Sequence, residues 1–408
     1  MLYDNAQLAR VYLHAWQITR NDFYRRIVTQ TLDYVAREMI DPRGGFYSTQ
    51  DADSEGHEGK FYVWSMEEIR AALGDDAQLL IDTYGVTERG NFEDKNILYV
   101  ARDLDVVAAM QHVPQAELEQ KLETARQKLF ALREQRIKPA RDEKVLTAWN
   151  GLMLAAFAEA ARVLHRADYR AIAERNADFG LSKMRDKNNR LLRSWKQGDA
   201  RLNGYLEDYA NLAEGLLALY ETTFDARWFV AARELADTML AHYADPRGGF
   251  FDTRDDHETL VTRPKDIQDN AVPSGNAMAL IVLLKLSAYT GDSRYADAAE
   301  RALKNIQPIL SQAALGFAQW LNAFDFASAS PKEIAIVGTV DSARAMLDVI
   351  GREYRPNQVV ALAEPNVVSP IPLLQNRAQV NNQATAYVCK NFACQLPVTD
   401  ADALAKQL

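Results

Sequence analysis

Two loops of the sequence concentrate side chains that can donate or accept protons. The first follows a Gly-Gly-Phe-Tyr turn and runs from residue 51 to residue 64. Carboxyl groups, an imidazole and aromatic rings alternate along it, a mixture that suits proton transfer beside a bound ligand. The candidates in this loop are Asp51, Asp53, Glu55, His57 and Trp64.

The second loop, residues 252–270, follows a Gly-Gly-Phe-Phe turn and again places a histidine among acids. Its candidates are His257, Arg263 and Asp269, and the helix start after it adds Ser274 and Asn276. A histidine titrates near neutral pH, so it can act as a base in one step and as an acid in the next. The repetition indicates that both loops contribute to function.

Polar and aromatic residues also recur where the predicted inner helices begin. Asn, Asp and Ser are favoured there as helix caps, because their side chains accept hydrogen bonds from unpaired backbone amides. Aromatic faces beside carboxylates and amides are also what a sugar ring needs for stacking and for hydroxyl recognition. We therefore predict a sugar-sized cleft at these starts, formed by Tyr3, Asn5, Trp149, Asn150, Glu207, Asp208, Tyr209, Ser274 and Asn276.

Two reactions are compatible with the candidate side chains. If His57 and His257 face one sugar carbon, they could supply the base and the acid of an epimerisation. If Asp53 instead pairs with Asp208 or Asp269 at the required separation, the two carboxyl groups could hydrolyse a glycosidic bond. Exposed loops are rich in such residues in any case. The alternative is therefore that each of these side chains is an ordinary solvent-exposed residue without a catalytic role.

The sequence predicts neither a metal site nor a cofactor. Residues 51–56 alternate acids as a calcium loop does, but Tyr62 stands where the closing glutamate belongs. Cys389 and Cys394 are the only cysteines. Their spacing matches neither a redox CxxC pair nor half of a zinc site, so we expect two reduced thiols.

A repeated pattern of paired helices must position these residues. Apolar residues recur at helical spacing over residues 4–35, and comparable pairs follow at 150–184, 206–243 and 276–310. Residues 65–136 read as a less distinct further hairpin. Each pair has an apolar stripe that it cannot bury alone, so the pairs must stack side by side. We predict an all-α toroid of helical hairpins, of the (α/α)6 type.

The pattern changes after about residue 330. Residues 333–337 and 358–363 are short apolar runs, residues 342–351 have helical spacing, and 385–389 read as one more strand. The predicted division is therefore a hairpin toroid over residues 1–328 and a small α/β C-terminal appendage over residues 329–408.

Composition excludes several classes of partner. The chain has 408 residues, 48% of them hydrophobic, with a formal net charge of -9, and no run of Lys and Arg is interleaved with aromatics. This argues against nucleic acid as a partner. No apolar stretch is long enough to span a membrane, and the first residues lack the features of a secretory signal, so we expect a cytoplasmic protein. The partner that we expect from the cleft residues is a small-molecule, sugar-like ligand.

Several motifs are specific enough to resemble a known family. They are Met1-Leu2-Tyr3-Asp4-Asn5-Ala6-Gln7-Leu8, Asp51-Ala52-Asp53-Ser54-Glu55-Gly56, Trp149-Asn150-Gly151-Leu152, Glu207-Asp208-Tyr209-Ala210 and Asp269-Asn270-Ala271-Val272-Pro273-Ser274-Gly275-Asn276. Over essentially its whole length the sequence resembles the YyaL-type, thioredoxin-domain-containing proteins. The spermatogenesis-associated thioredoxin-like proteins of animals resemble the same group.

The resemblance implies a six-hairpin glycosidase-like toroid, similar in fold to N-acylglucosamine 2-epimerases and cellobiose 2-epimerases. It also implies that a thioredoxin-like domain and the first toroid helices precede the segment that this chain covers. We therefore expect a ring that is incomplete at its N-terminal end. The predicted function is a carbohydrate-active protein, first a sugar epimerase or isomerase. The alternatives are a glycoside hydrolase with paired carboxylates and a non-catalytic sugar- or peptide-binding scaffold that partners a thioredoxin-like domain.

Overall fold

Pairs of helices form most of the fold, as the apolar pattern predicts. The computed structural model describes residues 1–258 and 261–408. Intrachain contacts divide them into two units, the first comprising Met1–Ser48 and Glu143–Leu408 and the second comprising Thr49–Asp142. Each unit has its own hydrophobic core.

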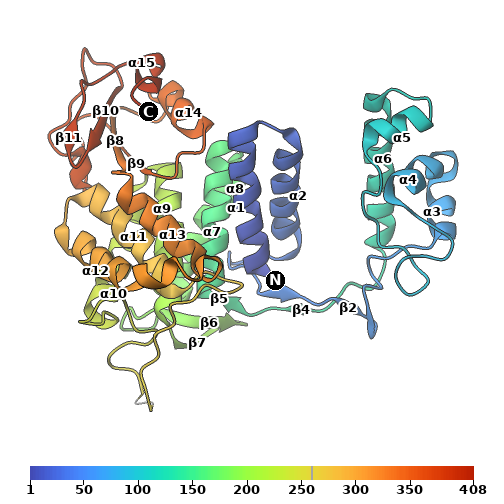
Figure 1. Cartoon of the computed structure of the whole chain (residues 1–408), viewed down its shortest axis with the longest axis horizontal. Helices are drawn as coiled ribbons and strands as arrows, with labels where there is room; N and C mark the ends of the chain where they lie inside the picture. The colour runs from blue at the N-terminus through green and yellow to red at the C-terminus, as the bar shows by residue number, and fades with distance from the viewer. Residues whose placement is uncertain (259–260) are drawn as a thin grey trace. The chain divides into compact units, whose positions relative to one another are not determined.

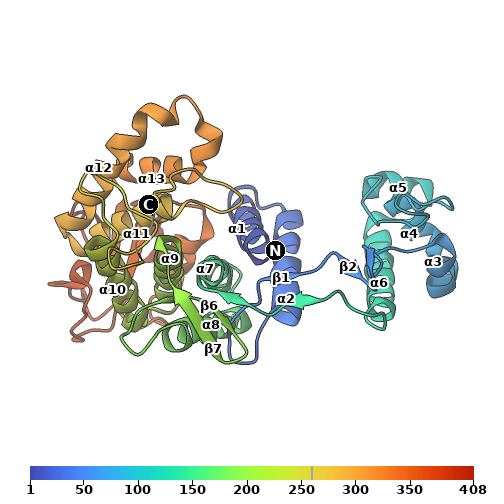
Figure 2. The ribbon, with the colours of Figure 1, turned by 90° about the horizontal axis from the view of Figure 1, so that it is seen from below.

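The first unit contains consecutive helical hairpins, each an inner helix followed by an outer one (Figure 1). They are α1 (Leu2–Thr19) with α2 (Asp22–Glu38), α7 (Thr147–Val163) with α8 (Ala167–Lys183), α9 (Leu206–Thr223) with α10 (Ala226–His242), and α11 (Gly275–Thr290) with α12 (Ser293–Leu310). One more helix, α13 (Ala318–Ser328), follows. The inner helices α1, α7, α9, α11 and α13 pack in this order, and α9 lies between α7 and α11 in both views (Figure 2). The predicted hairpins are confirmed.

The turns inside the hairpins explain where the outer helices begin. The side chains of Asn21, Asp225 and Asp292 each accept a hydrogen bond from the backbone amide two residues later. These bonds satisfy amides at the helix start that have no partner within the helix.

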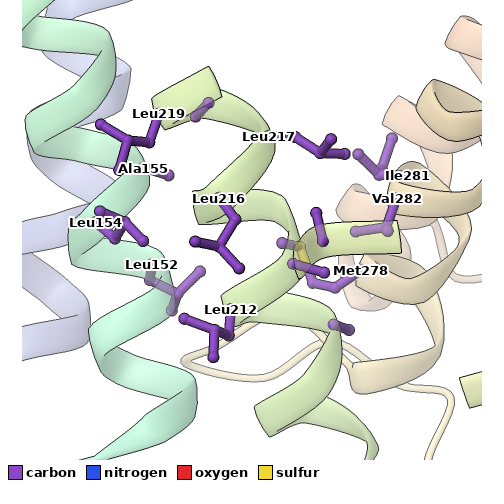
Figure 3. Close-up of a cluster of buried hydrophobic side chains, with 14 of the residues drawn as sticks. Leu152, Leu154, Ala155, Leu212, Leu216, Leu217, Leu219, Met278, Ile281 and Val282 are labelled. Atoms are coloured by element: carbon purple, nitrogen blue, oxygen red, sulfur yellow. The ribbon is translucent and has the colours of Figure 1, made fainter. Parts of the chain in front are cut away.

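The core of the first unit lies where α7, α9 and α11 meet. Helix α7 is rich in buried alanines, and Gly151 lets its backbone approach α9 closely. Leucines of α7 and α9 and apolar residues of α11 fill the space around this crossing (Figure 3), namely Leu152, Leu154, Leu212, Leu216, Leu217, Leu219, Met278, Ile281 and Val282. This core fixes the starts of the three helices relative to one another.

A small three-stranded sheet lies next to the starts of the inner helices. It consists of β5 (Val145–Leu146), β6 (Leu192–Lys196) and β7 (Asp199–Asn203), in the order β5-β6-β7 with antiparallel pairing. The apolar pattern did not predict these strands, because they are short and half of their side chains are polar.

The appendage has the predicted α/β character. Strands β8 (Lys332–Val337) and β9 (Gln358–Ala363) are parallel, and β10 (Thr385–Lys390) runs antiparallel to β8. Strand β11 (Ala393–Cys394) completes the order β11-β10-β8-β9. Helices α14 (Arg344–Arg352) and α15 (Ala401–Ala405) accompany this sheet. The class, hairpin helices with a small C-terminal sheet, is confirmed.

The expectation of two reduced thiols was wrong. Cys389 and Cys394 face each other across the pairing of β10 with β11 and are joined by a disulfide. Spacing along the sequence could not reveal this, because the pairing arises from a tight turn between two strands.

The second unit differs from the predicted extra hairpin of the ring. Its helices are α3 (Met66–Leu73), α4 (Ala77–Tyr84), α5 (Leu104–Met110) and α6 (Gln115–Arg133), and its short strands are β1 (Thr49–Gln50), β2 (Asp53–Ser54), β3 (His57–Glu58) and β4 (Arg141–Asp142). Helix α3 begins with a capping box formed by Ser65 and Glu68. These helices pack on one another around their own core. Their apolar faces are therefore buried without packing against a neighbouring hairpin. The domain boundary between residues 328 and 329 stays a prediction.

Candidate functional site

Two asparagines that the sequence predicts to bind substrate hold the repeated Gly-Gly-Phe turns. The side chain of Asn150 accepts from Phe46 N at 2.7 Å and donates to Phe46 O at 3.0 Å. Asn276 repeats this arrangement with Phe250, at 2.8 and 3.0 Å. Both asparagines are buried. They clamp the end of one hairpin to the start of the next inner helix, and their role in substrate binding stays a prediction.

Three further candidates order the backbone near the helix starts. The hydroxyl of Tyr209 is buried and accepts from Leu191 N at 3.1 Å. Ser274 caps α11 by accepting from the amide of Ala277. The two carboxylate oxygens of Asp269 accept from the amides of Ser274 and Gln319, each at 2.8 Å. These bonds give each of the three residues a structural role, and their predicted roles in catalysis or substrate binding stay predictions.

Two other candidates also bond mainly to the backbone. The amide of Asn5 donates to Met1 O at 2.8 Å. The guanidinium of Arg263 lies 4.2 Å over the ring of Phe251 and donates to the carbonyls of Thr253 and His242. Arg263 therefore braces the loop that precedes α11.

The start of α9 brings two carboxylates to one guanidinium. Nη1 of Arg193, on β6, lies 2.7 Å from Glu207 Oε1 and 3.2 Å from Asp208 Oδ2. Asp208 also accepts from the amides of Ala148 and Tyr205, both at 2.9 Å. Asp208 is buried and thus ties the start of α7 to the start of α9, while the partly exposed Glu207 is available to a ligand.

A third carboxyl group stands beside this pair. The backbone oxygen of Asp252 accepts from Leu206 N at 2.9 Å, which places Asp252 next to the first turn of α9. Its carboxylate accepts from the amide of Asp266 at 2.9 Å. Burial raises the pKa of Asp252 to about 6, and the charge of Glu207 adds to this. Burial likewise raises the pKa of Asp208 to about 7, although Arg193 opposes the shift.

Aromatic rings flank these acids. Tyr3 and Trp149 meet edge to face with their ring centroids 4.7 Å apart, and both are partly exposed. The guanidinium carbon of Arg193 lies 4.6 Å from the ring centroid of Tyr205. Gln7 of α1 donates to Ala271 O at 2.8 Å, which connects α1 to the loop before α11. We call this region the helix-start site, formed by Tyr3, Trp149, Arg193, Tyr205, Glu207, Asp208 and Asp252.

His257 lies at the margin of the helix-start site. Its ring centroid is 6.1 Å from that of Tyr205. Its Nδ1 is buried and, within residues 1–258 and 261–408, has no hydrogen-bond partner. A buried polar atom without a partner is uncommon in folded proteins and marks His257 as a residue whose role needs an explanation.

The candidates of the first loop lie in the second unit. Glu55 and His57 line a pocket of about 560 Å³ together with Lys60, which pairs with Glu55 at 3.0 Å. Asp51 and Asp53 are exposed, and Asp51 accepts from the amide of Asp53. Trp64 is buried in the core of this unit under the guanidinium of Arg136, 4.0 Å from its ring centroid, so it supports the unit and is not free to stack on a ligand.

His57 and His257 therefore belong to different units, and their action as one acid–base pair stays a prediction. Within the part of the chain that the structure describes, no three His, Cys, Asp or Glu side chains are arranged to hold a metal ion. Across the same residues, no helix has the length and apolar character needed to cross a bilayer.

Sequence reasoning missed Arg193, Tyr205 and the individual role of Asp252. Arg193 lies on a strand without a motif, so its type and spacing gave no signal. Asp252 could have been predicted from the repeat, because it occupies the same position after its Gly-Gly turn as Ser48 does. In the structure, Leu206 N donates to Asp252 O and Leu2 N donates to Ser48 O, both at 2.9 Å. Each pair joins the residue after a Gly-Gly turn to the start of an inner helix.

Comparison with known proteins confirms the resemblance to the spermatogenesis-associated proteins of animals. No protein-family model matches the chain. Its homologues include human spermatogenesis-associated protein 20, 33% identical, and the mouse protein, 32% identical, both over 100% of the chain. An uncharacterised protein of Caenorhabditis elegans is 25% identical over 98% of the chain. The chain spans 57% of the length of the human and mouse proteins.

Solved structures similar to the chain include sugar epimerases, an isomerase and glycoside hydrolases, all at low sequence identity. A sugar epimerase from a ruminal bacterium aligns with 10% identity and a TM-score of 0.39, covering 75% of each chain. A D-mannose isomerase aligns with 12% identity and a TM-score of 0.38, covering 74% of each chain. A family 105 glycoside hydrolase of C. acetobutylicum ATCC 824 aligns with 10% identity and a TM-score of 0.36, covering 74% of this chain and 76% of the other.

Proposed function

We propose that this chain acts on a carbohydrate at the helix-start site by proton transfer through Glu207 and Asp252. The supporting observation is that the two neighbouring carboxyl groups have different surroundings. Glu207 is paired with Arg193 at 2.7 Å, whereas burial raises the pKa of Asp252 to about 6. Glycoside hydrolysis needs this combination of one carboxylate and one carboxylic acid.

In this proposal each residue of the site has a separate task. Asp252 protonates the oxygen of the leaving sugar, and Glu207 activates water or attacks the sugar carbon. Asp208 holds Arg193 and the first turn of α9 in place. Trp149 offers a ring face to the apolar side of a sugar, and Arg193 can donate hydrogen bonds to its hydroxyl groups.

Removing either acid tests the proposal. We expect Glu207→Gln and Asp252→Asn each to lower kcat by about 100-fold or more, the contribution of a positioned acid or base. The measurement is release of reducing sugar from a panel of oligosaccharides by the purified chain. Glu174→Gln, which removes a carboxylate on outer helix α8, should leave kcat unchanged. Full turnover in both site variants would reject the proposal.

The pH dependence of turnover tests the role of Asp252 separately. An acid must carry its proton to act, and the pKa of Asp252 is raised to about 6. We therefore expect kcat/KM to fall as pH rises through about 6, by tenfold for each further pH unit. A rate that instead increases through this range would mean that Asp252 acts as a base.

His257 supports epimerisation or isomerisation as a second candidate. The supporting observation is its buried, unpartnered Nδ1 beside Tyr205, since an imidazole can carry a proton to and from a sugar carbon. Exchange of a carbon-bound sugar proton in heavy water, followed by NMR, reports this reaction directly. Exchange that disappears in His257→Gln would support it, and sugar release without exchange would support hydrolysis.

A further inference from the structure

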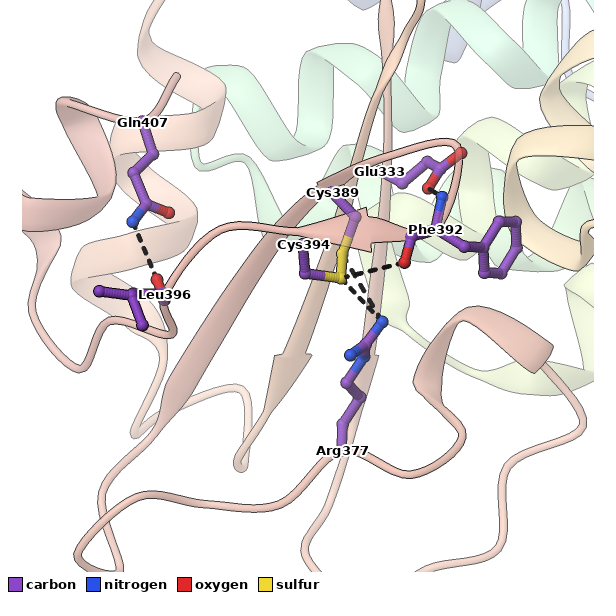
Figure 4. The surroundings of a disulfide bond; sticks show 7 residues. All are labelled: Glu333, Arg377, Cys389, Phe392, Cys394, Leu396 and Gln407. Carbon is purple, nitrogen blue, oxygen red and sulfur yellow. Dashed lines mark hydrogen bonds between the residues drawn. A yellow bond between two sulfur atoms is a disulfide. The ribbon is translucent and has the colours of Figure 1, made fainter.

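The disulfide of the appendage has an arginine aimed at its sulfurs. Nη2 of Arg377 lies 2.9 Å from Cys394 Sγ and 3.6 Å from Cys389 Sγ (Figure 4). We propose that Cys389 and Cys394 form a reversible redox site, reduced by dithiols, in which Arg377 stabilises the thiolate of Cys394. This inference is independent of the carbohydrate chemistry proposed for the helix-start site.

The charge of Arg377 is available to the sulfurs. Across residues 1–258 and 261–408, the side-chain hydrogen bonds of Arg377 go to the two sulfur atoms, and its guanidinium carbon lies 5.0 Å from the ring centroid of Tyr387. Its Nε is buried without a hydrogen-bond partner. A cation beside a cysteine lowers the pKa of the thiol, because it favours the thiolate over the thiol.

Glu333 is the acid whose charge interacts with Arg377, and its carboxylate is held by another partner. Glu333 directs Oε2 to the amide of Phe392, at 2.7 Å, rather than to the guanidinium (Figure 4). Burial raises the pKa of Glu333, which weakens its tendency to carry a negative charge. Lys390, next to Cys389, adds a second positive charge at the exposed end of β10.

The two sulfurs differ in access. Cys389 is 1% exposed, whereas Cys394 is partly exposed. A thiolate of an external dithiol therefore attacks Cys394 Sγ, and the Cys389 thiolate leaves and takes up a proton. The second thiol of the reagent then attacks its own sulfur in the mixed disulfide and releases Cys394 as a thiolate. The reagent ends as a cyclic disulfide, and the cysteine pair has gained two electrons.

Reduction should leave the surrounding fold in place. The turn between β10 and β11 is also held by the bond from Phe392 N to Glu333. The ring of Phe392 lies against the turn between α11 and α12, where a Cβ added to Gly291 would be 3.2 Å from it. Reversible thiol–disulfide exchange requires that the fold around the two cysteines persists in both oxidation states.

The test uses the full chain and two measurements. The first is the pH dependence of iodoacetamide labelling of reduced Cys394, read by mass spectrometry. We expect an apparent pKa below the ordinary thiol value of about 8.5, and a rise toward that value in Arg377→Gln. The second is equilibration with mixtures of reduced and oxidised dithiothreitol. At a pH above both pKa values, each unit by which the variant raises the pKa should make its disulfide about tenfold harder to reduce.

Two variants separate this role from a structural one. Arg377→Lys keeps a positive charge and should restore part of the low pKa, whereas Arg344→Gln removes a charge from α14 and should change neither measurement. Circular dichroism before and after reduction verifies that each protein is folded. An ordinary thiol pKa that is equal in the unsubstituted chain and Arg377→Gln would overturn the proposal, as would two free thiols in the air-oxidised chain.

Discussion

Gly151→Ala is expected to destabilise the first unit by about 3 kcal/mol, the upper end of the usual cost of overpacking. A Cβ at this position would lie 2.4 Å from the carbonyl carbon and 2.5 Å from the carbonyl oxygen of Asn211. Both are backbone atoms of α9, so no side-chain rotation can make room. Gly215 has the reciprocal position, because its added Cβ would be 2.6 Å from Gly151 O. Helices α7 and α9 would have to separate.

The measurement is the urea midpoint followed by circular dichroism, with Gly351→Ala as the matched control. Gly351 is also a helical glycine, but an added Cβ there meets nothing within 4 Å. Its replacement should be neutral or stabilising by about 0.5–1 kcal/mol, because glycine is a poor helix former. Equal midpoints for the two variants would show that the close approach of α7 and α9 is not a constraint on the fold.

The helical part of the fold was predictable because its signals are local. Apolar residues at spacings of three and four residues define α9 and α11, and caps such as Ser274 depend only on the residues next to them. The parallel strands β8 and β9 were equally readable, because buried strands are continuous apolar runs. Local patterns of this kind need no knowledge of distant contacts.

The candidate site was only partly predictable, because its geometry depends on contacts between distant segments. Glu207 and Trp149 were found from their places at helix starts. The clamping roles of Asn150 and Asn276 could not be predicted, since an amide that binds a ligand and one that clamps a distant turn have the same sequence signature. Arg193 reaches α9 from a strand that no apolar pattern marks.

Arg10→Met is expected to cost about 3–5 kcal/mol at pH 7, the usual result of removing one partner from a buried ion pair. Nη2 of Arg10 lies 2.6 Å from Glu159 Oε1 and 3.1 Å from Glu214 Oε1. The side chain of Glu214 is only 2% exposed. Lys285, 3.3 Å away, and His14 remain near the two acids, but neither replaces a guanidinium shared by both. The free energy of urea unfolding measures the loss.

The pH dependence of this loss identifies its cause. Burial alone would raise the pKa of Glu159, but the charge of Arg10 and the bond to His14 hold it well below the ordinary 4.5. A depressed carboxyl pKa stabilises the fold above about pH 4.5, and this stabilisation is lost as pH falls. The difference in the free energy of unfolding between Arg10→Met and the unsubstituted chain should therefore become smaller as pH falls below about 4.5. Arg25→Met, which breaks an exposed pair with Asp22, should cost less than about 1 kcal/mol at any pH. A gap that stays constant down to acid pH would mean that Arg10 acts through packing of its aliphatic stem and not through its charge.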